Sequence, residues 1–435
     1  QSGSAILQPQ SPLRPDSIQP KWLGSYFPSS PPPSFTITIP GATMGVLRRK
    51  SPLFRRKSSR NVSAIEAEVD YIVQRSPFLL ETETRAQHEE VPASLPAFQR
   101  KEYQTGSLLG SGSFSKVHAI IGFKLYSSSS RRNSKNQQQL QQSASTCSSD
   151  GSSSQLAPVV NPEELRTNLT KSAFDDAGNA KYAVKFVKKE LTKKSHAFRN
   201  AAADLIVEAK YLAALDHPNI LKLRGIAQAG SNGFLDGHDG FFIIVDRLEE
   251  TLGDRIQRWK EQPRCGDLLT VQANVALQMA SALEYLHERR ILFRDLKPTN
   301  VGFSCSDPNT VQLFDFGLCR ELPATEDSYH DEDEQQVFQM SGAGTYRYMA
   351  PEIINTKRYN LKADIYSWAV VFHEMIALER PFDEFTVEEH KEFVCEIGQR
   401  PSLTDCDMPT CLQALLRQAW EQDPVERLTM RQVCQ

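Results

Sequence analysis

Residues 291–300, with the sequence ILFRDLKPTN, decide how this chain is expected to fold. They follow VQANVALQMASALEYLHERR (271–290), whose apolar residues recur at the spacing of an amphipathic helix. After an apolar lead come Asp295, Lys297 and Asn300, which place a carboxylate, an ammonium and an amide within one short loop. This loop after a long helix is a candidate functional site.

Two more short motifs lie downstream of this loop. The tripeptide DFG (315–317) follows the strand-like VQLF twenty residues after Asp295, and APE (350–352) closes the polar segment beyond it. Two carboxylates such as Asp295 and Asp315 are, on their own, also typical of a solvated acidic pair. Set around a lysine, an amide and a phosphate-sized loop, they favour phosphate chemistry.

The phosphate-sized loop is GSGSFSKV (110–117), where glycines let the backbone approach phosphates closely. Ser115 stands where a third glycine is expected, so this motif alone is also typical of a tight turn. The strand-like run YAVK ends on Lys185, and a buried ammonium needs an acidic partner. Glu208, on the polar side of the helical pattern at 198–215, is the candidate. A lysine that reaches solvent is the alternative.

These motifs, in this order and at these separations, resemble the set found in eukaryotic protein kinases. The resemblance covers residues 100–435 approximately. It implies an α+β, bilobal protein-kinase fold, with a small antiparallel β-sheet N-lobe that carries one main helix and a larger helical C-lobe. We expect the N-lobe over residues 99–246 and the C-lobe over 249–435, where the end of the chain could cut the lobe short. The cofactors implied are ATP and Mg²⁺.

The resemblance also assigns catalytic roles. Lys185, paired with Glu208, would hold the α- and β-phosphates of ATP, and Lys297 would neutralise charge on the γ-phosphate. Asp295 would orient the substrate hydroxyl and accept its proton. The catalytic set is Asp295, Lys297, Lys185, Glu208, Arg294 and Thr345. The metal ligands implied are Asn300 and Asp315. The nucleotide-binding set is Gly110, Ser111, Gly112, Ser113, Val117, Ala183, Lys185, Asp246, Leu248, Asn300 and Asp315.

Other matches imply structural roles rather than catalysis. Glu352 and Arg427 resemble a buried ion pair, and Asp364 resembles a helix residue that braces the backbone of the catalytic loop. Phe293 stands where the family commonly has a histidine. Because that position packs in an apolar column and carries no proton, we expect Phe293 to be compatible with turnover. The other members of the column would be Phe316, Leu212 and Leu223.

The nucleotide pocket carries a larger departure from the family. Val245 is expected at the gatekeeper position, with residues 246–248 as the hinge that bonds adenine through its backbone. Gly302 stands where an apolar side chain usually lies under the adenine, so it removes contact area and predicts a modest loss of ATP affinity. Phe303 is expected to fill part of this gap.

Substrate class and regulation follow from the segment near residue 345. Lys297 and Thr345 resemble Ser/Thr kinases, and GTYRYMAPE with GQRPSL resembles the tyrosine-kinase-like group. We expect protein Ser/Thr hydroxyls as substrates, with dual specificity left open. Ser341 matches the family's main phosphosite, which an upstream kinase or autophosphorylation would modify, and Arg294 would pair with its phosphate. The acidic run at 326–334 is the alternative for holding this segment open.

Composition separates the remaining segments. Residues 1–60 carry a net formal charge of +8 and many prolines, whereas the whole chain is at −3, so we expect residues 1–98 to be a mostly disordered basic tail. Residues 127–156 contain twelve Ser and six Gln, which predicts a low-complexity insertion over about 124–180. Two RRKS blocks, at 48–51 and 55–58, are candidate phosphorylation sites.

Other function classes are excluded or kept as alternatives. We find no apolar run long enough for a membrane span, no secretory signal and no metal-type spacing among eight scattered cysteines. We therefore expect an intracellular, cytoplasmic protein with no nucleic-acid partner. A pseudokinase scaffold that binds nucleotide or partners without turnover is one alternative. An adaptor whose basic tail contacts acidic membranes or acidic partners is another.

Overall fold

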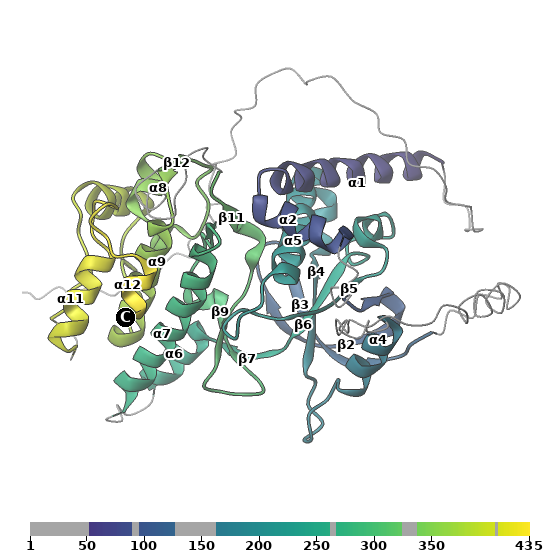
Figure 1. Cartoon of the computed structure of the whole chain (residues 1–435), viewed down its shortest axis with the longest axis horizontal. Coiled ribbons are helices and arrows are strands. Elements are labelled where there is room, and N and C mark those ends of the chain that lie inside the picture. The colour runs from purple at the N-terminus through teal and green to yellow at the C-terminus, as the bar shows by residue number, and fades with distance from the viewer. Residues whose placement is uncertain (1–51, 89–94, 127–161, 262–266, 324–336, 405–407) are drawn as a thin grey trace, which may run out of the picture. The chain divides into compact units, whose positions relative to one another are not determined.

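The computed structural model describes residues 52–88, 95–126, 162–261, 267–323, 337–404 and 408–435, with side chains described over 61–82 in the first range. One part of the chain is built around a sheet, and the other is mainly helical (Figure 1). Within the described ranges, no helix combines the length and the apolar character needed to cross a bilayer.

A six-stranded sheet forms the core of the first part, in the order β1-β5-β6-β4-β3-β2. Its strands pair antiparallel except β1 and β5, which run parallel. The central strand β4, YAVKFV, is rich in β-branched and aromatic residues and is buried throughout, which places Lys185 inside the molecule. The strands are β1 (Ala97–Phe98), β2 (Tyr103–Ser111), β3 (Ser115–Phe123), β4 (Tyr182–Val187), β5 (Leu223–Ala227) and β6 (Phe242–Asp246).

The main helix of this part is α5 (Ser195–Ala214), which contacts β4 and β5. Buried residues occur around the whole helix between Phe198 and Leu212. A helix that is buried all round needs partners on the face turned away from the sheet. The helices α1 and α2 supply them (Figure 1).

The prediction of a disordered tail was wrong for residues 52–88, which form α1 (Pro52–Val73) and α2 (Pro77–His88). The proline-rich, basic composition of the residues before them concealed a helical stripe in NVSAIEAEVDYIV (61–73). The apolar members of this stripe are buried: Val62, Ile65, Val69, Ile72 and Val73. Outside the described part lie the side chains of both RRKS blocks, residues 1–51 and residues 89–94.

The prediction of a low-complexity insertion over 124–180 was wrong for its last part. Residues 127–161 lie outside the described residues, but the next ones form α4 (Pro162–Lys171). Arg166 of α4 donates from Nη2 to Glu102 Oε1 at 2.8 Å, and the two side chains are only 9% and 1% exposed. This buried ion pair fixes α4 beside the sheet.

The second part is organised around the buried helices α7 and α9. Fifteen consecutive residues of α9, from Lys362 to Ile376, are buried, and Trp368 donates its Nε1 to the carbonyl of Ala276 in α7 at 2.9 Å. The expected larger helical region is confirmed. Its helices are α6 (Leu252–Glu261), α7 (Leu268–His287), α8 (Pro351–Asn355), α9 (Lys362–Ala377), α10 (Val387–Glu389), the π-helical His390–Glu396, α11 (Thr410–Ala419) and α12 (Met430–Cys434). Its short strands are β7 (Leu248–Thr251), β8 (Ile291–Leu292), β9 (Val301–Ser304), β10 (Val311–Leu313), β11 (Arg320–Glu321), β12 (Phe338–Gln339) and β13 (Arg358–Tyr359).

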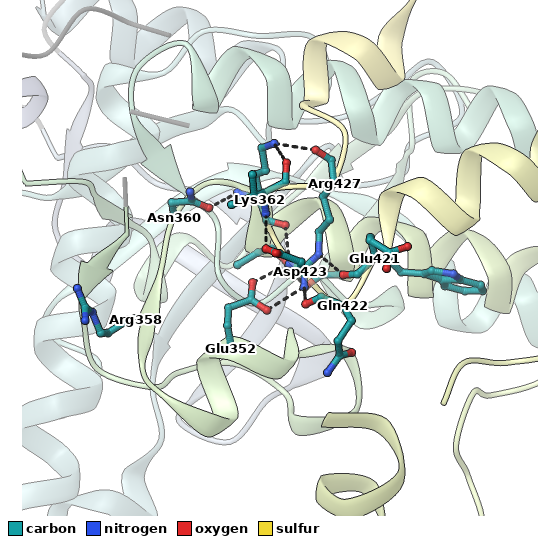
Figure 2. Close-up of polar contacts among 12 residues, drawn as sticks. Glu352, Arg358, Asn360, Lys362, Glu421, Gln422, Asp423 and Arg427 are labelled. Carbon is teal, nitrogen blue, oxygen red and sulfur yellow. Dashed lines mark hydrogen bonds and ion pairs between the residues drawn. The ribbon is translucent and has the colours of Figure 1, made fainter. Parts of the chain in front are cut away.

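A buried ion pair ties α8 to the segment before α12. Arg427 donates from Nη1 and Nη2 to the two carboxylate oxygens of Glu352 at 2.6 and 2.9 Å. Figure 2 shows Lys362 beside this pair, with its Nζ donating to the carbonyl of Arg427 at 2.7 Å. Arg427 also donates to the carbonyls of Glu421, Gln422 and Lys362. The pair predicted from the sequence is therefore embedded in backbone hydrogen bonds.

Candidate active site

Lys185 lies among two carboxylates. Its Nζ donates to Glu208 Oε1 and Oε2 at 2.8 and 2.6 Å, and to Asp315 Oδ1 at 2.7 Å. The lysine comes from β4 and Glu208 from α5, while Asp315, with a left-handed φ of 71°, precedes the turn η5 (Phe316–Leu318). The expected partner of the buried lysine is present, so Lys185 does not reach into solvent.

Electrostatics favour the charged forms of Lys185 and Asp315, whereas burial raises the pKa of Glu208 to about 7. Burial by itself lowers the pKa of Lys185, but the carboxylates of Asp315 and Glu208 outweigh burial and raise this pKa above its ordinary value. The ammonium of Lys185 in turn holds the pKa of Asp315 below its usual range. An ammonium beside an ionised carboxylate is a setting that suits phosphate groups together with a divalent cation.

Asp295, Lys297 and Asn300 meet Thr345 in a second cluster. Lys297 Nζ donates to Asp295 Oδ2 at 2.7 Å and to Thr345 Oγ1 at 2.8 Å, and Thr345 Oγ1 donates to Asp295 Oδ1 at 2.7 Å. Asn300 Nδ2 donates to the carbonyl and to Oδ2 of Asp295 at 2.9 and 3.0 Å. Donors therefore hold both carboxylate oxygens of Asp295, which fixes the orientation of its side chain.

A groove of 980 Å³ opens beside this second cluster. Its lining includes Lys297 and Thr345 of this cluster together with Asp254 and Lys260 of α6. Seven residues between Leu378 and Phe385, after α9, and the four residues 399–402 contribute further lining. The groove carries charged side chains of both signs and reaches the catalytic loop, so it is suited to an extended polypeptide.

Asp364 of α9 holds the backbone of the catalytic loop. Its Oδ2 accepts from the amide of Phe293 at 2.8 Å and its Oδ1 from the amide of Arg294 at 2.9 Å. Arg294 has a φ of 72°, a conformation that costs a non-glycine residue free energy and persists only where its surroundings hold it. The two hydrogen bonds supply that support, so the predicted brace is present.

Phe293 packs against Phe316 of the DFG motif. Their ring centroids are 5.2 Å apart in an edge-to-face arrangement, and both side chains are fully buried. Leu212 and Leu223 are buried in the same apolar core. The position of Phe293 thus uses an aromatic ring for packing.

The glycine-rich loop connects β2 to β3 at the edge of the sheet. Val117 pairs with Lys185 in the β3–β4 ladder, and Ala183 faces Val245 in the β4–β6 ladder. A Cβ added at either glycine of the loop would meet no atom within 4 Å, so there is open space on that side. Of the residues predicted to bind nucleotide here, Gly110 and Ser111 lie at the end of β2, and Gly112 and Ser113 lie in the connection.

The space at Gly302 is filled from the hinge. A Cβ added at Gly302 would stand 2.5 Å from Cδ1 of Leu248 and 3.2 Å from its Cβ, so Leu248 already occupies this position. Phe303 was predicted to fill part of this gap, but successive side chains of β9 point to opposite faces, and the Phe303 ring centroid lies 3.7 Å from the guanidinium carbon of Arg255. The structure therefore gives that prediction no support. Asp246, also in the hinge, accepts two hydrogen bonds of 2.7 Å from the guanidinium of Arg224.

Comparison with known proteins decides the family. A family model described as protein kinase domain matches residues 169–435, more than half of the chain. The chain belongs to the protein kinase family. Serine/threonine-protein kinase VIK of Arabidopsis thaliana is 31% identical, over 51% of this chain and 46% of its own length. Serine/threonine-protein kinase ULK3 of Mus musculus is 30% identical over 57% and 47%, and serine/threonine/tyrosine-protein kinase HT1 of Arabidopsis thaliana is 28% identical over 51% and 50%. This chain therefore spans about half the length of these three relatives.

In the kinase domain, Arg294 also reaches Ser341. Its guanidinium donates to the carbonyl of Ser341 and, at 3.1 Å, to its Oγ, while Tyr359 donates its hydroxyl to the same carbonyl at 2.8 Å. Burial lowers the pKa of Arg294, and the nearby Arg320 contributes to the lowering. Ser341 itself is exposed. The acidic run at 326–334 lies outside the described residues.

Sequence reasoning missed two polar features, Asp204 and the contact between Ser76 and Glu321. Asp204 lies one helical turn before Glu208 on α5, and burial raises its pKa to about 6. A Cβ added at Gly317 would stand 3.1 Å from Cβ of Asp204, so α5 packs closely on the DFG segment. The four-residue spacing from Glu208 was the available signal for Asp204. No local sequence pattern indicates the second feature, the hydrogen bond between Ser76 and Glu321.

Proposed function

We propose that this chain is an ATP-dependent protein kinase, which transfers the γ-phosphate of ATP to serine and threonine hydroxyls of protein substrates in intracellular signalling. The observation that supports this most is the bridge that Lys185 forms between Glu208 and Asp315. A buried ion pair is weak evidence for stability, whereas perturbed titratable groups brought together from separate elements are typical of functional sites.

Lys185 would bind the phosphates of the nucleotide, with the backbone amides of residues 110–113 around them. The hinge at 246–248 would bond the adenine, and Ala183 would pack against it. Leu248 would replace the contact area that Gly302 lacks. We therefore expect a smaller loss of ATP affinity than the sequence alone predicts.

The donor set fits Mg²⁺. The carboxylate of Asp315 and the side-chain oxygen of Asn300 would hold the ion, which would supply positive charge beside the phosphate oxygens. Among the described residues, no cluster of three or more His, Cys, Asp or Glu could hold a metal. This agrees with Mg²⁺, which proteins usually bind through one or two carboxylates together with substrate phosphates.

Asp295 would accept the proton of the substrate hydroxyl as the oxygen attacks. Asn300 and Thr345 orient its carboxylate, and Lys297, 2.7 Å away, would place positive charge where the γ-phosphate is transferred. The adjoining groove would position the substrate polypeptide. Dual specificity stays open.

Ser341 would be the activating phosphorylation site. Ser341 is exposed as a residue, and its hydroxyl already lies at the guanidinium of Arg294, with Arg320 close enough to affect the same group. A phosphate there would gain charge-assisted hydrogen bonds and order the segment. An upstream kinase or autophosphorylation would supply it.

Transfer of labelled phosphate from ATP to a generic protein substrate, followed by phosphoamino-acid analysis, tests the proposed activity. We expect label on serine and threonine, and none with Asp315→Asn, which removes the metal-binding charge. The matched control is Asp216→Asn, because Asp216 also pairs with a lysine, Lys222 at 3.0 Å, but is exposed. Equal labelling by wild type and Asp315→Asn would overturn the proposal, and an inactive wild type would favour the pseudokinase scaffold.

A further inference from the structure

The helix α1 is fastened to two elements of the sheet-containing part. Its buried apolar stripe packs against α5, the helix that carries Glu208. Beyond α5, Glu66 Oε1 accepts from the hydroxyl of Ser231 at 2.7 Å, in the turn η3 (Gly230–Leu235) that follows β5. α5 also contacts η5 of the DFG segment. α1 therefore closes the face of α5 that the sheet and η5 do not cover.

The helix α2 begins at the activation segment. Ser76 Oγ donates to Glu321 Oε2 at 2.6 Å, and the amide of Phe78 donates to the same oxygen at 2.9 Å. Ser76 Oγ also accepts from the amide of Leu79 at 3.2 Å, as a helix N-cap does. The carboxylate of Glu321 thus lies at the N-terminus of α2, where negative charge is favoured. Ser76 is 2% exposed, so this contact is enclosed.

Glu321 connects this contact to the DFG segment and to the start of the catalytic loop. It lies six residues after Asp315, and in the β8–β11 ladder it faces Ile291, directly before the catalytic loop. The amide of Leu322 donates to the carbonyl of Arg290 at 2.8 Å, which extends the pairing. A displacement of Glu321 would therefore move the base of the DFG segment and the start of the catalytic loop together.

We propose that α1 and α2 form a clamp that holds α5 against the DFG segment, and that Ser76 and Glu321 are the positioning residues that lock it. While Ser76 contacts Glu321, Glu208 and Asp315 are both held at Lys185. Separation of Ser76 from Glu321 releases α2 and uncovers α5, which lets Glu208 move away from the lysine. The proposal rests on the proposed kinase activity, for which that arrangement is required.

Ser76→Asp tests the lock without removing the cap, because Asp caps helices as well as Ser does. The new carboxylate would face that of Glu321, and like charges repel. We expect kcat to fall at least about fivefold with the KM for the protein substrate unchanged, and amide exchange of residues 205–212 to speed up by a similar factor without nucleotide. Adding Glu321→Gln should restore both within about twofold, because its amide can donate to the carboxylate.

The matched control is Thr429→Asp, since Thr429 caps α12 with the same 3.2 Å acceptance from a backbone amide and lies outside the activation segment. It should leave kcat and α5 exchange at wild-type values. If Ser76→Asp does not fold, Glu321→Gln alone is the milder probe, with an expected loss of about threefold in kcat. Wild-type kcat and α5 exchange in the charged variant, or no recovery in the double variant, would overturn the clamp. An inactive wild type would instead count against the proposed kinase activity, and the exchange measurement would still test the clamp.

Discussion

Two buried ion pairs of this chain have similar chemistry and different surroundings. The pair Arg427–Glu352 is enclosed by backbone carbonyls that the same guanidinium bonds, so its position is set locally. The pair Lys185–Glu208 joins a strand to a helix, and that helix is held by α1, more than a hundred residues earlier in the chain. The first pair is suited to fixing the fold, and the second to responding to what packs on α5.

Lys185→Met gives the largest expected effect on activity. Phosphotransfer should fall below detection, because the phosphates lose their ammonium. The free energy of unfolding should change little, since burial raises the pKa of Glu208 and the carboxyl takes up a proton once Lys185 no longer opposes this. Labelled-ATP transfer and urea denaturation measure the two quantities. A large drop in the free energy of unfolding together with retained phosphotransfer would reverse the contrast between the two pairs.

Arg427→Leu gives the largest expected effect on stability. The free energy of unfolding should drop by about 3–5 kcal/mol, because Glu352 loses its partner and three carbonyls lose a donor. Urea denaturation of this variant beside Lys185→Met makes the comparison direct. A loss below about 1 kcal/mol would show that the pair Arg427–Glu352 contributes as little to stability as we expect of the pair Lys185–Glu208.

Ser341→Ala acts on the segment between the two pairs. We expect kcat to fall about tenfold, which corresponds to about 1.4 kcal/mol of transition-state stabilisation. Phosphatase treatment of the wild type should have the same effect, and mass spectrometry of Ser341 would accompany both assays. Full activity after both treatments would make the acidic run at 326–334 the better candidate.

Gly302→Ala tests the packing of the hinge on a smaller scale. The added methyl group requires Leu248 to move, so the KM for ATP should rise about threefold while kcat changes less. Leu248→Ala in the same chain should recover most of the affinity. An unchanged KM in the single variant would mean that Leu248 moves aside without cost.

Phe293→His should have the smallest effect. The site packs a ring against Phe316, and an imidazole supplies a ring of similar shape. We expect kcat within several-fold of wild type, measured beside Lys185→Met as the inactive reference. A hundredfold gain would show that Phe293 restrains the native enzyme.

The extent of sequence-based prediction differs between these regions. Asp295, Asn300 and Asp315 were singled out because they stand in short motifs at characteristic separations, and the structure places Asn300 against Asp295 and Asp315 against Lys185. The helix at residues 52–73 was missed because composition outweighed its apolar spacing. The contact of Ser76 with Glu321 joins residues 245 positions apart, and the space at Gly302 is filled by a side-chain position of Leu248. Neither feature produces a local sequence pattern, since both depend on how separate elements pack.

Glu102 has a practical consequence for protein engineering. Its Oε1 accepts from the amide of Tyr126 at 3.3 Å and from Arg166 at 2.8 Å, so the chain is secured to one buried carboxylate just before residues 127–161 and just after them. Loop-closure cost grows only slowly with length once both ends are held together. A fluorescent reporter or an affinity tag inserted between residues 127 and 161 would therefore start and finish at fixed points, and the sheet that holds Lys185 would not have to adjust to its size.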